Sequence, residues 1–246
     1  MKLWRWSYVL ILLLPLAGSA PAKEKEKEKE PAGQSVDSGS FSVIVKGRRV
    51  GTETFSVSQN GNGSVIRSEF KAEGAAGQAL QNSELQLTAT GEIRRYQWKE
   101  LSPEKAQSVV VPNDQVLTQK WSSGSDDKEQ EQPYLLPAAT IILDDYFFVH
   151  REVLAWKYLG QACSKEKDGL RCPKAQFGTL NPRQHSSASA TMEYLGREKI
   201  AWHDAEREFN KLELKSDAGS WLIWLDDQFK LQKISIPGES TEVVRD

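Results

Sequence analysis

Residues 135–160, LLPAATIILDDYFFVHREVLAWKYLG, form the one long segment with a helical pattern, and strand-like sequence flanks it on both sides. At ~100° per residue its apolar side chains fall into two stripes. One stripe contains Tyr146, Val149, Val153 and Trp156, and the other Phe147, Leu154 and Tyr158. A helix that is apolar on several sides is usually buried on several sides. We therefore predict a central helix over residues 144–159 that the rest of the chain encloses.

Asp144 and Gly160 mark the expected ends of this helix. The short carboxylate of Asp144 suits an N-cap, because it can accept hydrogen bonds from the free N–H groups of the first turn. Gly160 suits the C′ position. Asp144 and Asp145 are also candidates for metal ligands or catalytic carboxylates, but negative charge at a helix N-terminus is stabilising in itself. We favour the capping role.

Segments of alternating polarity on both sides of the helix predict a mainly β protein. Seven short strands are expected between residues 40 and 121, with Asn60-Gly61 as a turn signal. Residues 221–236 predict a hairpin turning at Asp226-Asp227, and its first strand is apolar on both faces. Strands at hairpin spacing indicate an antiparallel meander and not βαβ units. We predict a single domain over residues 40–246, in which one curved antiparallel sheet wraps the helix.

Residues 1–22 have the features of a secretory signal peptide: a positively charged start, an apolar stretch at 8–14, and Ala20-Pro21-Ala22 as a cleavage site. Cleavage after Ala20 and an uncleaved anchor are the alternatives. The apolar stretch is far shorter than the ~20 residues of a membrane-spanning helix. We therefore predict a periplasmic or secreted protein with no transmembrane span after cleavage.

Residues 23–39 begin with the strict alternation KEKEKEKE and continue with residues typical of loops. Such a segment has no apolar face and cannot contribute to a core, so we predict a disordered linker. A spacer or an electrostatic contact to a surface is the functional alternative. Alternating charges cancel, which favours the plain linker.

Cys163 and Cys172 are the two cysteines of the chain, and the Asp168-Gly169 turn signal lies between them. Behind a signal peptide, two cysteines this close predict a structural disulfide. A redox or metal-binding pair is the alternative, but there is neither a C-x-x-C spacing nor a matching second pair of ligands.

The sequence favours a protein that is not an enzyme and that needs no cofactor or metal. The formal net charge of −2, without a clustered basic run, also excludes a role dominated by nucleic acid. No nucleophile, zinc or phosphate-loop motif occurs. Among the three histidines, His203 precedes Asp204 on a predicted strand, where neighbours face opposite ways, and His185 lies in a loop. His150 on the helix is a candidate ligand contact, a candidate base, or a core histidine.

Three motifs together carry a resemblance to a known class: FSVIVKGRRVGTETFSV at residues 41–57, Leu-Asp-Asp at 143–145, and WLIWLDDQFKLQKI at 221–234. With the signal peptide, this pattern resembles uncharacterised bacterial periplasmic proteins related in shape to the lipoprotein-carrier and lipoprotein-receptor half-barrels. The resemblance implies a half-barrel or open barrel, covered by helix on its concave side, that holds an acyl chain or another apolar ligand.

The leading functional hypothesis is a non-catalytic protein that binds a lipid or another apolar ligand between helix and sheet. The alternative is a structural or interaction protein of the cell envelope, with a filled core and a protein partner. A histidine-dependent hydrolase is the third and least supported class. The candidate ligand-binding residues are Tyr146, Val149, His150, Val153, Trp156, Trp98 and Trp224.

Overall fold

The computed structural model describes residues 33–74, 79–124, 128–167, 169–202, 204–217 and 219–246, which belong to one compact unit. The predicted signal peptide, residues 23–32 of the predicted linker, and His203 lie outside these residues. Among the described residues, no helix is long and apolar enough to span a membrane.

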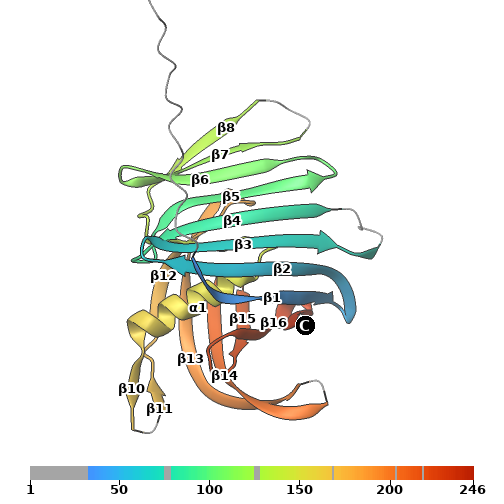
Figure 1. Cartoon of the computed structure of the whole chain (residues 1–246), viewed down its shortest axis with the longest axis vertical. Helices are drawn as coiled ribbons and strands as arrows, with labels where there is room; N and C mark the ends of the chain where they lie inside the picture. Colours follow the sequence, from blue (N-terminus) through green and yellow to red (C-terminus); the bar gives the residue numbers. More distant parts are fainter. Residues whose placement is uncertain (1–32, 75–78, 125–127, 168, 203, 218) are drawn as a thin grey trace, which may run out of the picture. The chain divides into compact units, whose positions relative to one another are not determined.

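The predicted mainly β architecture with one large antiparallel sheet is confirmed (Figure 1), except that the short edge segment Ile141–Ile142 pairs in parallel with Ala175–Asn181. The strands of the large sheet are β1 (Gln34–Val45), β2 (Arg48–Asn60), β3 (Gly63–Ala72), β4 (Leu80–Thr88), β5 (Ile93–Ser102), β6 (Gln107–Asn113), β7 (Val116–Ser122), β8 (Gln130–Tyr134), β9 (Ile141–Ile142), β12 (Ala175–Asn181), β13 (Ser186–Trp202), β14 (Ala205–Ser216), β15 (Gly219–Leu225), β16 (Leu231–Ile236) and β17 (Thr241–Arg245). Strands β10 (Ser164–Glu166) and β11 (Gly169–Arg171) form a separate hairpin, and η2 (Pro237–Glu239) is a 3₁₀ turn.

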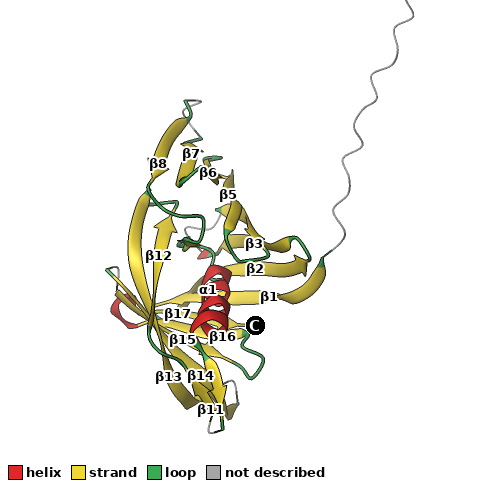
Figure 2. Ribbon diagram, turned by 90° about the vertical axis from the view of Figure 1, so that its left-hand side faces the viewer, coloured by secondary structure: helices red, strands yellow, loops and turns green. Residues whose placement is uncertain are grey.

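The strand order across the large sheet is β8-β7-β6-β5-β4-β3-β2-β1-β17-β16-β15-β14-β13-β12-β9. Strand β1 pairs with β17, so the first and last strands of the described chain meet in the middle of the sheet. The sheet does not close into a barrel, because β8 and β9 are its two edges. It curves around the helix α1 (Val149–Ala162), which has strands from both halves of the chain near it (Figure 2).

The predicted bounds of the helix, 144–159, are wrong at both ends. Asp144 does not cap the helix: its side chain accepts a hydrogen bond from the Tyr146 N–H, which fixes a bend ahead of the first turn. The helix then passes through Gly160 and ends where Cys163 becomes extended. No Schellman-type stop is needed at Gly160, because the disulfide hairpin beginning at Cys163 redirects the chain.

Two strand predictions also differ from the structure. Strand β1 begins at Gln34, so the predicted linker over 23–39 ends earlier than expected, and its Asp37 is buried. The sequence pattern of residues 186–202 predicts a loop at 186–189 and two strands, 190–195 and 198–201, whereas the structure has the single long strand β13 there. A register shift between Tyr194 and Gly196 accommodates the extra residue by a bulge, so the pairing with β14 continues past the glycine.

The predicted disulfide and the terminal hairpin are confirmed. Cys163 and Cys172 are bonded and flank the β10–β11 hairpin. Strands β15 and β16 pair around the turn that contains Asp226. Phe41 and Phe55 stack with ring centroids 4.7 Å apart, within the core cluster that also contains the buried face of α1.

Candidate ligand-binding cavity between the helix and the sheet

A cavity of about 480 Å³ lies between α1 and the sheet, beside Trp156. Its volume is within the ~300–1,000 Å³ typical of small-molecule pockets. The helix contributes His150, Val153, Trp156, Lys157, Gly160 and Gln161 to its lining, and the sheet side contributes mainly Leu85, Leu87, Ile93, Thr140, Ile141 and Ile142. The rest of the lining is mostly small or polar: Gln59, Ser64, Thr88, Ala89, Thr90 and Gly91. Polar and apolar side chains are both present, but the larger part of the lining surface is apolar, so the cavity suits a molecule that is apolar over most of its length.

The periodicity of each element explains this lining. His150, Val153, Trp156 and Gly160 are three or four residues apart, and such residues share one face of a helix. On the sheet side, Leu85 and Leu87 are two residues apart on β4, so they point to the same face. Leu87 pairs with Ile93 of β5, and this extends the apolar wall across two strands. An amphipathic helix and an alternating strand therefore leave two apolar surfaces facing one space.

His150 is the most deeply buried polar side chain of the cavity, with a relative exposure of 1%. Neither of its ring nitrogens has a hydrogen-bond partner among the described residues. Burial lowers the pKa of His150 to about 3, so the ring is neutral at physiological pH. The ring packs edge-on against Tyr96, with centroids 5.5 Å apart. The imidazole therefore offers one donor and one acceptor that the described part of the protein leaves unused.

Thr140 adds a second polar group with the same property. Its side chain is buried, and its hydroxyl has no partner in the described residues. Lys157 differs, because its ammonium donates to the carbonyl oxygens of Gly91 at 3.2 Å and Ala139 at 2.8 Å. Burial lowers the pKa of Lys157. The polar part of the lining thus includes two buried neutral groups without a partner in the described residues and one ammonium that is engaged by the backbone.

The cavity brings together three of the seven candidate ligand-binding residues, namely His150, Val153 and Trp156. Val149 is fully buried in the core and does not line the cavity. Tyr146 precedes the helix, is 40% exposed, and lines a different cavity of about 370 Å³.

Trp98 and Trp224 also lie outside the cavity. The guanidinium of Arg183 lies over the Trp98 ring, 4.1 Å from its centroid. Trp224 belongs to a separate cluster with Trp202 and Phe209, because alternate residues of β15 point to opposite faces of the sheet. The presence of an aromatic side chain on a predicted strand therefore did not predict which residues line the cavity.

The structure places Asp144 in a group of buried polar contacts with Arg151 and Arg183, which the sequence analysis did not single out. Asp144 accepts hydrogen bonds from the Tyr96 hydroxyl and from Arg183 Nε, both at 2.7 Å. Arg151 is buried and donates to the backbone carbonyl oxygens of Asp144 and Phe147. Its guanidinium also lies 4.4 Å from the Trp221 ring centroid. These contacts hold the bend before α1 against both halves of the sheet.

Glu53 of β2 takes the capping role that the sequence analysis gave to Asp144. Its fully buried carboxyl accepts hydrogen bonds from the backbone N–H of Phe148 at 2.6 Å and of Val149 at 3.4 Å. The Ser68 hydroxyl donates to it at 2.5 Å. Burial raises the pKa of Glu53 to about 7, although these hydrogen bonds act in the opposite direction. A residue far away in the sequence therefore supplies the acceptor at this helix terminus.

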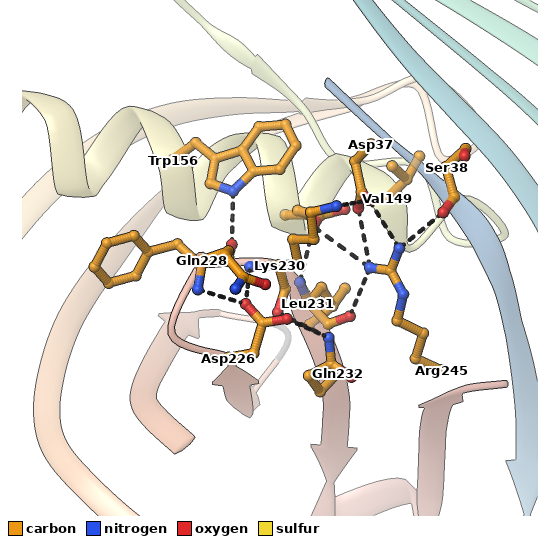
Figure 3. Close-up of polar contacts among 12 residues, drawn as sticks. Asp37, Ser38, Val149, Trp156, Asp226, Gln228, Lys230, Leu231, Gln232 and Arg245 are labelled. Carbon is orange, nitrogen blue, oxygen red and sulfur yellow. Dashed lines mark hydrogen bonds and ion pairs between the residues drawn. The ribbon is translucent and has the colours of Figure 1, made fainter. Parts of the chain in front are cut away.

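A second buried cluster joins both ends of the described chain to the helix (Figure 3). Arg245 of β17 donates to both carboxylate oxygens of Asp37 at 2.9 Å, and Lys230 pairs with the same carboxylate. Glu152 Oε1 accepts the Leu231 N–H at 2.8 Å. Burial raises the pKa of Glu152 well above its ordinary value, and the nearby charge of Asp37 acts in the same direction.

Trp156 links this cluster to the cavity. Its indole N–H donates to the Phe229 carbonyl oxygen at 2.7 Å, in the β15–β16 turn that also carries Lys230 (Figure 3). The ring itself forms part of the cavity wall. The position of that wall therefore depends on a turn anchored to β1.

One sequence signal pointed to these clusters. His150, Arg151 and Glu152 are consecutive, and three consecutive residues span about 200° of a helix. Because two sides of this helix are apolar and face the core, three consecutive polar residues cannot all point to solvent, and at least one of them is expected to be buried. None of Glu53, Asp144, Arg151 and Glu152 lines the 480 Å³ cavity. Within the described residues, no group of three or more His, Cys, Asp and Glu side chains is placed to hold a metal ion.

Comparisons of the chain with protein-family models, with curated proteins and with solved structures found no significant match. The resemblance to the lipoprotein-carrier half-barrels therefore stays a prediction from sequence pattern. The fold and the cavity define a broad class: an antiparallel β protein with one helix and an apolar space between helix and sheet.

Proposed function

We propose that this protein is a non-catalytic binder of an apolar or amphipathic ligand, such as a lipid, in the cavity beside Trp156. The observation that carries the proposal is the 480 Å³ space between helix and sheet, whose lining surface is mainly apolar. Binding sites for small molecules are concave and mostly apolar, with a few polar groups that orient the ligand. Within this proposal the curved sheet acts as a half-barrel that holds the ligand against α1.

The proposal places the protein in the periplasm or outside the cell. The signal-peptide pattern of residues 1–22 supports this location. The disulfide between Cys163 and Cys172 supports it independently, because disulfides persist mainly in oxidising compartments.

The first test is mass spectrometry of lipids extracted from the mature protein after purification from the periplasm. A stoichiometric apolar molecule supports the proposal. The second test is displacement of the fluorescent probe N-phenyl-1-naphthylamine. If the protein neither carries a lipid nor binds the probe, the ligand-binding proposal fails, and a pull-down from envelope extract then tests the alternative of a protein partner.

Gly160 offers a way to block the cavity without disturbing the core. It lies on the helix in the cavity lining, and a Cβ at this position would meet no atom within 4 Å. Replacing helical glycine also favours the helix by up to about 1 kcal/mol. Gly160→Leu should weaken probe binding at least tenfold by occupying the space, whereas the matched Gly160→Ala control should change it less than threefold. Equal binding by both variants would place the probe elsewhere.

A further inference from the structure

The cavity beside Trp156 is buried at one end and exposed at the other. Along α1 its lining changes from His150, which is 1% exposed, to the exposed Gly160. Along β4 the lining changes in the same way, from the buried Leu85 to the exposed Thr90 of the β4–β5 turn. The cavity therefore has a buried end and a mouth that is open to solvent.

Contacts between helix and sheet show that the two buried ends coincide and that the two exposed ends coincide. At the buried end, the His150 ring packs against Tyr96, with centroids 5.5 Å apart, and Tyr96 pairs with Leu85. At the mouth, Lys157 Nζ donates to the Gly91 carbonyl oxygen of the β4–β5 turn at 3.2 Å. The buried part of the lining is mostly aliphatic, through Leu85, Ile93, Ile141 and Ile142.

Lys157 carries the only charge among the described residues that line the cavity. Its ammonium has three N–H donors, and two of them are used by the carbonyl oxygens of Gly91 at 3.2 Å and Ala139 at 2.8 Å. Carbonyl oxygens carry no net charge, and no ion pair within the described part of the chain includes Lys157. Glu92 raises the pKa of Lys157 from outside the lining, but by less than burial lowers it. The mouth therefore has a positive charge that no ion pair compensates.

We infer that the ligand of this cavity is an amphipathic anion, whose apolar chain occupies the buried end and whose anionic head group lies at the mouth and accepts a hydrogen bond from Lys157. This inference rests on the proposed ligand-binding function and adds the class of ligand to it. Hydrogen bonds between an ammonium and an anion are roughly twice as strong as those between neutral groups. An anion at the exposed mouth also keeps part of its hydration, which it would lose at the buried end.

The test compares decanoate with decanamide, which has the same chain and a head group of nearly the same shape but no charge. Binding is measured at neutral pH by displacement of N-phenyl-1-naphthylamine from the mature protein. A cavity that recognises only apolar surface would prefer the amide, because a carboxylate is more costly to remove from water. We expect the wild-type protein to bind decanoate at least tenfold more tightly than decanamide.

Three lysine variants show whether Lys157 is responsible for this preference. Lys157→Met removes the charge and keeps an unbranched side chain, so the preference should fall to less than threefold through weaker binding of decanoate, with little change for decanamide. Lys157→Arg keeps the charge and should retain a preference of at least fivefold. Lys71→Met, at an exposed position of β3 outside the lining, is the matched control and should bind both molecules as the wild-type protein does.

A measurement on the wild-type protein separates contact with the head group from a purely structural role of Lys157. The pKa of Lys157, followed through its ¹⁵Nζ resonance, should rise when decanoate binds, because a nearby anion stabilises the charged form of the side chain. Decanamide should leave this pKa unchanged. The measurement applies even if Lys157→Met does not fold.

The outcomes separate the inference from the proposed function. If decanoate and decanamide displace the probe equally, or if decylammonium binds more tightly than decanoate, the anion inference is overturned while ligand binding stands. If Lys157→Met weakens both molecules by the same factor and decanoate does not raise the pKa of Lys157, the lysine only supports the mouth, and the inference is again overturned. If the protein binds neither the probe nor any of these molecules, the proposed function fails, and the inference fails with it.

Discussion

Replacing Glu53 by glutamine tests the finding that a distant strand caps the central helix with a buried carboxyl. Glutamine keeps an oxygen that can accept the Phe148 N–H, and its amide can donate to the Ser68 hydroxyl, which reverses the bond that Ser68 donates to Glu53. The substitution removes the ability of this position to ionise and, at a cost that does not depend on pH, the long contact from the Val149 N–H. The expected effect is therefore a change in how stability depends on pH, with the fold preserved.

The sign and size of the effect follow from the pKa of Glu53, which burial raises from 4.5 to about 7. Below pH 4.5 the carboxyl is protonated in both the folded and the unfolded protein, and the stability linked to this raised pKa is fully present. Between pH 4.5 and 7 the unfolded carboxyl ionises first, so stability falls as pH rises. At about 1.4 kcal/mol per pH unit the wild-type protein loses about 3 kcal/mol across this window. Above pH 7 the loss is constant.

The assay is urea denaturation of wild-type protein and Glu53→Gln at intervals from pH 4.5 to 8. Subtracting the two unfolding free energies at each pH leaves the contribution of Glu53 alone, because His150 and Glu152 are present in both proteins. We expect this difference to shift by about 3 kcal/mol in favour of the variant as pH rises. Glu69→Gln on β3, where the side chain is exposed, is the matched control and should give a nearly constant difference. The same constant difference for Glu53→Gln would refute a raised pKa at this buried cap.

Three further predictions concern other parts of the structure. Arg245→Met should lower the unfolding free energy by up to about 3–5 kcal/mol in urea, since the buried Asp37 carboxylate loses two charged hydrogen bonds and keeps its ion pair with Lys230. The control Arg197→Met, at an exposed ion pair, should cost under about 1 kcal/mol. Replacing both Cys163 and Cys172 by serine should lower stability by somewhat under about 3 kcal/mol in thermal denaturation, with probe binding unchanged because the hairpin is exposed. His150 should stay neutral down to about pH 4 in an NMR titration, since burial lowers its pKa to about 3. The stability linked to this lowered pKa is fully present above pH 6.5 and is lost as the pH falls towards 3. Titration of His150 near pH 6.5 would contradict its burial.

The sequence pattern correctly predicted those parts of the fold in which interacting residues are close together along the chain. Alternation of apolar residues and turn signals predicted the antiparallel sheet and the β15–β16 hairpin, because neighbouring strands in a meander are also neighbours in sequence. The spacing of Cys163 and Cys172 predicted the disulfide for the same reason. These features depend on partners that are close enough along the chain to be recognised from the sequence.

The helix boundary and the buried charges depend on distant partners. Glu53 lies 95 residues before the Phe148 N–H that it caps, and Arg245 lies 208 residues after Asp37. No local pattern distinguishes such a carboxyl from an ordinary strand residue. The same holds for Trp98 and Trp224: the sequence shows that they are aromatic, but the sheet geometry decides which face meets the helix.

The two buried clusters also explain why the helix does not move into the cavity beside it. Glu53 and Arg151 fix the first turn of α1 to β2 and to the preceding bend, and Glu152 fixes the same turn to β16. Trp156 and Lys157 then hold the next turn through carbonyl oxygens of two separate turns. A shift towards Leu85 and Leu87 would break several of these bonds and leave charges buried without partners, which costs about 3–5 kcal/mol for each broken pair. The polar contacts of Glu53, Arg151 and Glu152, which the sequence did not predict, therefore hold the helix away from the sheet and keep the cavity beside Trp156 open.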